Sequence, residues 1–153
     1  MGQIADRLSA LGLALPPAPA PVASYAPFVV SGATVFISGQ ISKTPDDAVL
    51  GRLGDGLGVA DGQRAARLCA LNLLAQLRAA CDGDLDRLVQ CIKITGYVAS
   101  APDFTEQPAV INGASDLLLD VFGDPGRHAR AAVGAPSLPL GVAVEIDGLF
   151  EIR

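Results

Sequence analysis

The feature that most constrains the fold is a helical apolar stripe in the middle of the chain. Between residues 60 and 81, apolar side chains recur at helical spacing, at Ala66, Ala70, Leu73, Leu77 and Ala80. Such a stripe must be buried against another layer of structure, and Gly83 supplies a stop signal just beyond it. We therefore predict a long amphipathic helix that packs against a sheet.

Strand-like segments surround this helix. Residues 28–30 and 34–38 are β-branched and aromatic, and Ser31-Gly32 between them predicts a tight hairpin. A long strand is expected at 89–99, a second helix from Phe104 to Phe122 ending at Gly123, and two more strands at 131–135 and 141–152. The predicted order is a first helix followed by β-β-α-β-α-β-β. This order indicates an α+β fold, with two long helices on one face of a mixed sheet.

The first 24 residues are expected to form a helix and a proline-rich connector. Ile4, Leu8 and Leu11 fall at helical spacing, and prolines at 16, 17, 19 and 21 favour an extended chain. The first segment carries Asp6 beside Arg7 and lacks the net positive charge of a signal peptide. We predict a cytoplasmic protein with one domain over residues 1–153, whose core spans 25–153.

The composition indicates self-association. Half of the 153 residues are hydrophobic and only 18% are charged, yet no apolar run reaches the roughly 18 residues that a membrane helix needs. The surplus apolar surface therefore predicts a subunit interface and no membrane partner. A net charge of −5 without a lysine-rich tract argues against a nucleic-acid partner.

No metal site is expected. Cys69, Cys81 and Cys91 lack C-x-x-C spacing, and the chain has a single histidine. Buried reduced thiols are the favoured interpretation of the cysteines.

Two loops resemble ligand-binding motifs only superficially. The glycines of Gly54–Gly58 lack the G-x-G-x-x-G spacing of a dinucleotide loop, so we interpret this segment as a flexible lid or an edge loop. Asp82, Asp84 and Asp86 imitate the first half of a calcium loop, but its glycine and glutamate are missing. Capping and turn formation explain these aspartates better.

Arg130 is the most informative polar residue because it lies among small apolar residues in a strand-like run. It is either half of an ion pair, for example with Glu145, or a clamp for a ligand carboxylate, since a guanidinium binds two oxygens at once. His128 has no second histidine and no nucleophile motif near it, so a structural role that holds a loop is favoured over that of a base.

Glu145 lies between apolar neighbours in Val-Ala-Val-Glu-Ile. Such a strand carboxylate commonly faces solvent. If it instead faces a pocket, it can orient or deprotonate a water molecule.

Several motifs together resemble the YjgF/Rid group, the reactive intermediate deaminases that are also labelled "endoribonuclease L-PSP". The resemblance covers the chain from Phe28 to Ile152 and is closest to a longer branch of the group. It rests on Tyr25, Ser38-Gly39-Gln40-Ile-Ser, the helix that begins near Ala60, Asn112-Gly113-Ala-Ser-Asp-Leu-Leu, His128-Ala-Arg130-Ala-Ala-Val-Gly, Leu-Pro139-Leu and Glu145.

This resemblance implies a chorismate-mutase-like α+β subunit in a homotrimer, with a cleft at each subunit boundary. It implies that Arg130 holds the substrate carboxylate and that Glu145 places the hydrolytic water. Tyr25 and Asn112 would line the cleft, with backbone groups near Gly39 and Ala132 completing it. Ala132 stands where the deaminase branch often has cysteine, a change that the expected backbone contact tolerates.

The function implied is hydrolysis of 2-imino acids, or their enamine tautomers, to 2-keto acids and ammonia. An imine carbon is already electrophilic, so positioning and one oriented water suffice, without metal or cofactor. The alternatives are a non-catalytic trimer that binds a small carboxylate metabolite, and a ribonuclease as the old label suggests. The acidity of the chain counts against the ribonuclease. Chorismate rearrangement is a further alternative, but it needs a more cationic site than this chain offers.

Overall fold

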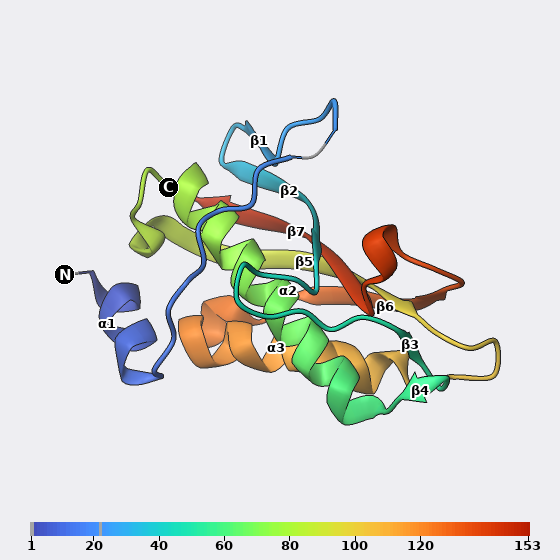
Figure 1. The fold of residues 1–153 in the computed structure, drawn as a ribbon. Coiled ribbons are helices and arrows are strands. Elements are labelled where there is room, and N and C mark those ends of the chain that lie inside the picture. The colour runs from blue at the N-terminus through green and yellow to red at the C-terminus, as the bar shows by residue number, and fades with distance from the viewer. Residues whose placement is uncertain (1, 22) are drawn as a thin grey trace.

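A five-stranded mixed sheet forms the centre of the computed structural model, which describes residues 2–21 and 23–153 (Figure 1). Its strand order is β1-β2-β7-β5-β6, and every neighbouring pair is antiparallel except β5 and β6. The strands are β1 Phe28–Ser31, β2 Thr34–Ile41, β5 Leu88–Ala99, β6 Ala129–Ala135 and β7 Val144–Ile152.

Two long helices, α2 Val59–Ala80 and α3 Gln107–Phe122, lie together on one face of this sheet (Figure 1). Four members of the predicted stripe are fully buried there, namely Ala66, Ala70, Leu73 and Leu77. The α+β fold, with its mixed sheet and its two long helices on one face, is therefore confirmed.

Several predicted boundaries were wrong. β2 continues to Ile41, and Ser31 belongs to β1, so the hairpin turn is Gly32-Ala33. Three other elements begin at different residues than predicted, and turn chemistry explains two of these differences. α3 begins at Gln107 and not at Phe104, because a turn closes from Phe104 N–H to the Ala101 carbonyl (3.1 Å) before Pro108 opens the helix. β7 begins at Val144 and not at 141, because residues 139–141 form a 3₁₀ turn in which Leu140 has φ 58°. β6 begins at Ala129, two residues earlier than predicted.

The glycine loop contains a short parallel pair of strands, β3 Arg52–Leu53 and β4 Gly56–Leu57. Leu53 is fully buried, and its carbonyl accepts a hydrogen bond from Ala101 N–H at 2.9 Å. A segment anchored in the core in this way favours the edge-loop interpretation over the lid.

The predicted first helix is confirmed as α1, Gln3–Ala10. Asp86 caps the first turn of α1, because its carboxylate oxygens accept hydrogen bonds from the N–H groups of Gln3 (2.7 Å) and Ile4 (2.8 Å). Asp84 accepts from Asp86 N–H at 3.0 Å, so these two aspartates serve as cap and turn, as predicted. The connector then crosses α2 (Figure 1), where Gln76 Nε2 donates to the Pro19 carbonyl at 2.6 Å.

The face of the sheet opposite the helices carries exposed apolar side chains, among them Val29, Phe36 and Val133. Such an uncovered face is what the surplus hydrophobicity predicted. Among the described residues, none of the helices combines the length and the apolar character that crossing a bilayer requires.

Candidate functional site

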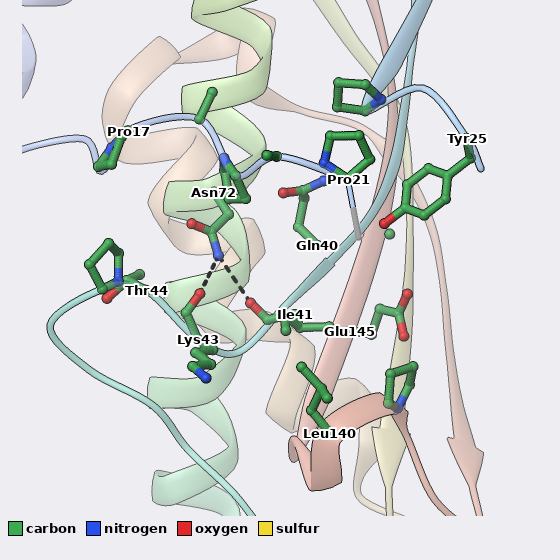
Figure 2. A pocket seen from close by; sticks show the side chains of 17 residues that line it. Pro17, Pro21, Tyr25, Gln40, Ile41, Lys43, Thr44, Asn72, Leu140 and Glu145 are labelled. Atoms are coloured by element: carbon green, nitrogen blue, oxygen red, sulfur yellow. Dashed lines mark hydrogen bonds between the residues drawn. The ribbon is translucent and has the colours of Figure 1, made fainter. Parts of the chain in front are cut away.

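Three of the predicted site residues, Tyr25, Gly39 and Glu145, line one pocket of about 750 Å³ (Figure 2). The pocket lies between the proline-rich connector, the last residues of β2 and the start of β7. It forms there because β1 pairs only with residues 34–37 of β2. Beyond Ile37, the edge of β2 that faces away from β7 has no neighbouring strand. None of the residues that line it comes from 51–58.

Strand alternation directs Glu145 into this pocket. Val144 and Ile146 are fully buried toward the helices, so Glu145 between them points from the opposite face. Its carboxylate lies against Gly39, and a methyl group at residue 39 would overlap Oε1. The Ser-Gly-Gln motif thus needs glycine at its centre because any side chain there would displace the carboxylate.

The surroundings of Glu145 favour its protonated form. Partial burial, and then the negative charge of Asp147, raise the pKa of the Glu145 carboxyl above its usual value. Asp147 accepts a hydrogen bond from the Tyr97 hydroxyl at 3.3 Å, and its charge raises the pKa of that phenol. Among the described residues no donor binds the Glu145 carboxylate, which leaves its oxygens available to a water molecule or a ligand.

Arg130 and Asn112 meet elsewhere, where β6 runs beside α3. Arg130 Nη1 donates to Asn112 Oδ1 at 2.8 Å and to Ser115 Oγ at 3.2 Å, and Nη2 donates to the Pro108 carbonyl at 3.2 Å. No described carboxylate pairs with Arg130, so the ion pair with Glu145 is not formed. Of the five N–H groups of a guanidinium, three are engaged and two remain for a ligand.

The two groups of predicted residues lie on different faces of the sheet. Arg130 is paired in register with the fully buried Ile94 and turns toward α3, as does Ala132, which packs against the core. Glu145 is paired with Tyr97 and turns the other way. One chain therefore does not bring all six predicted residues together.

Sequence reasoning missed several participants. Ser115 binds both Arg130 and His128, and its spacing of three from Asn112 places both on one side of α3, which was the available signal. Asn72 and Lys43 also line the pocket. Asn72 Nδ2 donates to the carbonyls of Ile41 (3.1 Å) and Lys43 (2.8 Å), as Figure 2 shows, and no sequence signal marked this contact.

The chemistry available is that of carboxylates, hydroxyls and one guanidinium. Within residues 2–21 and 23–153, no group of three or more His, Cys, Asp or Glu side chains is placed to hold a metal ion. All three cysteines are buried and unpaired, as predicted. Burial raises the pKa of the Cys91 thiol to about 12, so it stays protonated and unreactive.

Known proteins resemble this chain over nearly its whole length. Residues 5–150 match the family model described as "YjgF/chorismate_mutase-like, putative endoribonuclease". Protein TCP17 of Trypanosoma cruzi is 49% identical over 99% of this chain and 96% of its own. The crystal structure of Atu1372, a protein with unknown function from Agrobacterium tumefaciens, is 51% identical, with a TM-score of 0.91 over 98% of this chain and 92% of its own. A 2-iminobutanoate/2-iminopropanoate deaminase of Dermatophagoides farinae is 26% identical over 92% of this chain and 95% of its own.

Proposed function

Because this chain belongs to the YjgF/chorismate-mutase-like family, we propose that it hydrolyses reactive 2-imino acids, or their enamine tautomers, to 2-keto acids and ammonia. The observation that carries the proposal is the Glu145 carboxylate, which lines a pocket, accepts no hydrogen bond from the described residues and has a raised pKa. A carboxyl with a raised pKa and oxygens open to a ligand suits general acid-base catalysis. The deaminase relative from Dermatophagoides farinae supports the same reaction class.

Each proposed role follows from the chemistry of its side chain. Arg130 binds the substrate carboxylate through its two remaining N–H groups, on the side away from α3. Glu145 accepts a proton from water as the water attacks the imine carbon, and it passes that proton to the nitrogen. It then takes the hydroxyl proton of the resulting carbinolamine and gives it to the nitrogen as the C–N bond breaks, which releases the 2-keto acid and ammonia. Tyr25 and Asn112 shape the pocket, while the backbone at Gly39 and Ala132 binds the substrate.

We place this reaction between the subunits of a homotrimer. Arg130 and Glu145 face opposite sides of the sheet, so both reach one small substrate only if each comes from a different chain. The exposed apolar side chains Val29, Phe36 and Val133 would be covered in such an assembly. A closed oligomer is the usual way to cover a face of this kind.

Turnover is tested with 2-aminoacrylate, generated in solution by a serine dehydratase. We expect the purified protein to accelerate release of ammonia and pyruvate above the rate of the dehydratase alone, and Glu145→Gln to abolish the acceleration. Glu151→Gln is the matched control, since Glu151 lies on the same strand but is exposed at its far end. Equal rates with and without the wild-type protein would refute the deaminase.

The shared site is tested by mixing two inactive variants, Arg130→Ala and Glu145→Gln. If the two residues act from different chains, about a quarter of the sites in randomly mixed oligomers contain both native residues, and a similar fraction of activity returns. If they act from one chain, mixing restores nothing. Subunits must be exchanged by mild denaturation, with a wild-type sample treated identically as the reference.

A non-catalytic carboxylate sensor is the second candidate, favoured by the way α3 holds Arg130 in position before any ligand binds. It predicts that pyruvate or another 2-keto acid binds with wild-type affinity to Glu145→Gln and that no protein variant releases ammonia. A ribonuclease would instead cleave RNA with Arg130→Ala as fast as wild type.

A further inference from the structure

A chain of hydrogen bonds leads from a backbone carbonyl to the guanidinium of Arg130. His128 Nδ1 lies 2.6 Å from the Gly126 carbonyl oxygen, and Nε2 lies 2.9 Å from Ser115 Oγ. Ser115 Oγ in turn lies 3.2 Å from Arg130 Nη1. The four groups come from the turn before β6, from α3 and from β6 itself, so the chain of bonds joins three parts of the fold.

The direction of every proton in this chain follows from its two ends. A carbonyl oxygen only accepts, so the bond to Gly126 requires hydrogen on Nδ1. In the neutral ring Nε2 then carries no hydrogen and accepts from the Ser115 hydroxyl. Because that hydroxyl hydrogen is committed to His128, the lone pairs of Ser115 Oγ are left for the N–H of Arg130.

The first member of the chain is rigidly placed. Gly126 is buried, and a Cβ atom there would overlap the backbone of Leu118 in α3. Its own N–H donates to the Gly123 carbonyl at 2.8 Å. The carbonyl that orients the imidazole is thus fixed by direct packing of the turn on α3.

Without the histidine, Ser115 has another option. A serine inside a helix commonly turns its hydroxyl to a backbone carbonyl in the preceding turn, or rotates among rotamers. Arg130 lies on an edge strand, where its long side chain has freedom to lose. A fixed acceptor such as Ser115 Oγ therefore contributes more to the orientation of this guanidinium than it would for an arginine enclosed by the core.

We propose that His128, acting through Ser115, is a positioning residue for Arg130. In this scheme His128 touches no substrate; its imidazole fixes the hydroxyl of Ser115, which fixes one N–H of the guanidinium. Asn112 and the Pro108 carbonyl fix two others. The consequence for turnover rests on the proposed deaminase function, whereas the state of the imidazole does not.

The imidazole is tested directly by nitrogen NMR. His128 is the single histidine of the chain, so its ring signals need no assignment. The nitrogen that carries the hydrogen is identified on the high-pH plateau, where the ring chemical shifts no longer change with pH. We expect hydrogen on Nδ1. Hydrogen on Nε2 would overturn the proposed relay of hydrogen bonds from His128 through Ser115 to Arg130, whatever the protein catalyses.

Kinetics test whether the relay reaches Arg130. Ser115→Ala should raise KM for the imino acid about fivefold, the value of one hydrogen bond, and leave kcat nearly unchanged. Ser115→Thr, which keeps the hydroxyl, should restore KM. Asp116→Ala serves as the control, because Asp116 is the exposed neighbour on α3.

The outcomes separate the relay from the function on which it rests. An unchanged KM in Ser115→Ala, with normal wild-type turnover, would overturn the relay and leave the deaminase intact. If the wild type shows no turnover, the dissociation constant of pyruvate is measured in place of KM. The same fivefold weakening in Ser115→Ala then supports the relay, and equal affinity overturns it.

Discussion

Arg130 and Glu145 are placed in opposite ways. The guanidinium is held by three hydrogen bonds that it donates to α3, whereas the half-buried Glu145 carboxylate accepts none from the described residues. The first arrangement suits a group that must bind a charge without moving. The second suits a group that must exchange a proton, since a firmly bonded carboxylate is a poor base. The contrast teaches that hydrogen-bond satisfaction, more than burial, separates an anchor from a proton carrier.

Glu145→Gln should have the largest effect. The amide keeps the shape of the side chain but accepts no proton, so we expect kcat to fall about 1000-fold with KM nearly unchanged. Stability should move the other way. A carboxyl whose folded-state pKa is raised lowers the stability of the fold as pH rises from the unfolded-state pKa through the folded-state pKa, so the variant should melt slightly higher than wild type at neutral pH. Steady-state kinetics and calorimetry measure both, and a retained kcat would break the comparison.

Arg130→Ala should come next and affect the other kinetic parameter. Losing a charged, two-pronged contact should lower kcat/KM about 100-fold, mainly through KM. Arg130→Lys keeps the positive charge but not the planar pair of N–H donors, so it should recover only part of the lost kcat/KM. Arg127→Ala controls for surface charge, since Arg127 is exposed and its guanidinium lies 3.5 Å from the Asp124 carboxylate. A loss confined to kcat would contradict the anchoring role.

Gly39→Ala sharpens the comparison from the pocket side. The new methyl group would push the Glu145 carboxylate aside, and we expect kcat to fall about tenfold from this displacement. Gly58→Ala is the matched control, because a Cβ atom there meets only Asp61 Oδ2, at 3.9 Å. Binding of pyruvate should survive in both variants, which isothermal titration can establish.

Asp147→Asn should have the smallest effect, visible only in the pH profile. Glu145 must be ionised to accept a proton, so activity falls as pH drops through its raised pKa. Removing the charge of Asp147 lowers that pKa, and the acid limb of kcat should move to lower pH. A limb that moves upward, or stays in place, would show that another group controls it.

The sequence predicted the layers of the fold because both helices carry long apolar periodicities. It did not predict how Asp86 caps α1 or how Gln76 binds the connector, since these contacts join segments 57 to 83 residues apart. For the site, Arg130 and Glu145 were marked by their own sequence surroundings, and the resemblance supplied the other four residues and the proposed roles. The sequence left open whether Glu145 faces solvent or a pocket. The sequence could not reveal that the Arg130 side chain turns toward α3, because this orientation depends on where Asn112 and Pro108 lie in space. The roles of all six residues stay predictions.

The residue that caps α1 also touches the other end of the chain. Arg153 Nη2 donates to the Asp86 carbonyl at 3.0 Å, and Arg153 N–H donates to the Arg87 carbonyl at 3.0 Å. Gln3 and Arg153 are therefore both bound to one turn, and such a close approach of distant segments is the geometry that tolerates circular permutation. A short peptide joining them would let new termini be opened at the exposed Gly32-Ala33 turn between β1 and β2, and reporter groups could then be attached beside β1 without disturbing the two long helices.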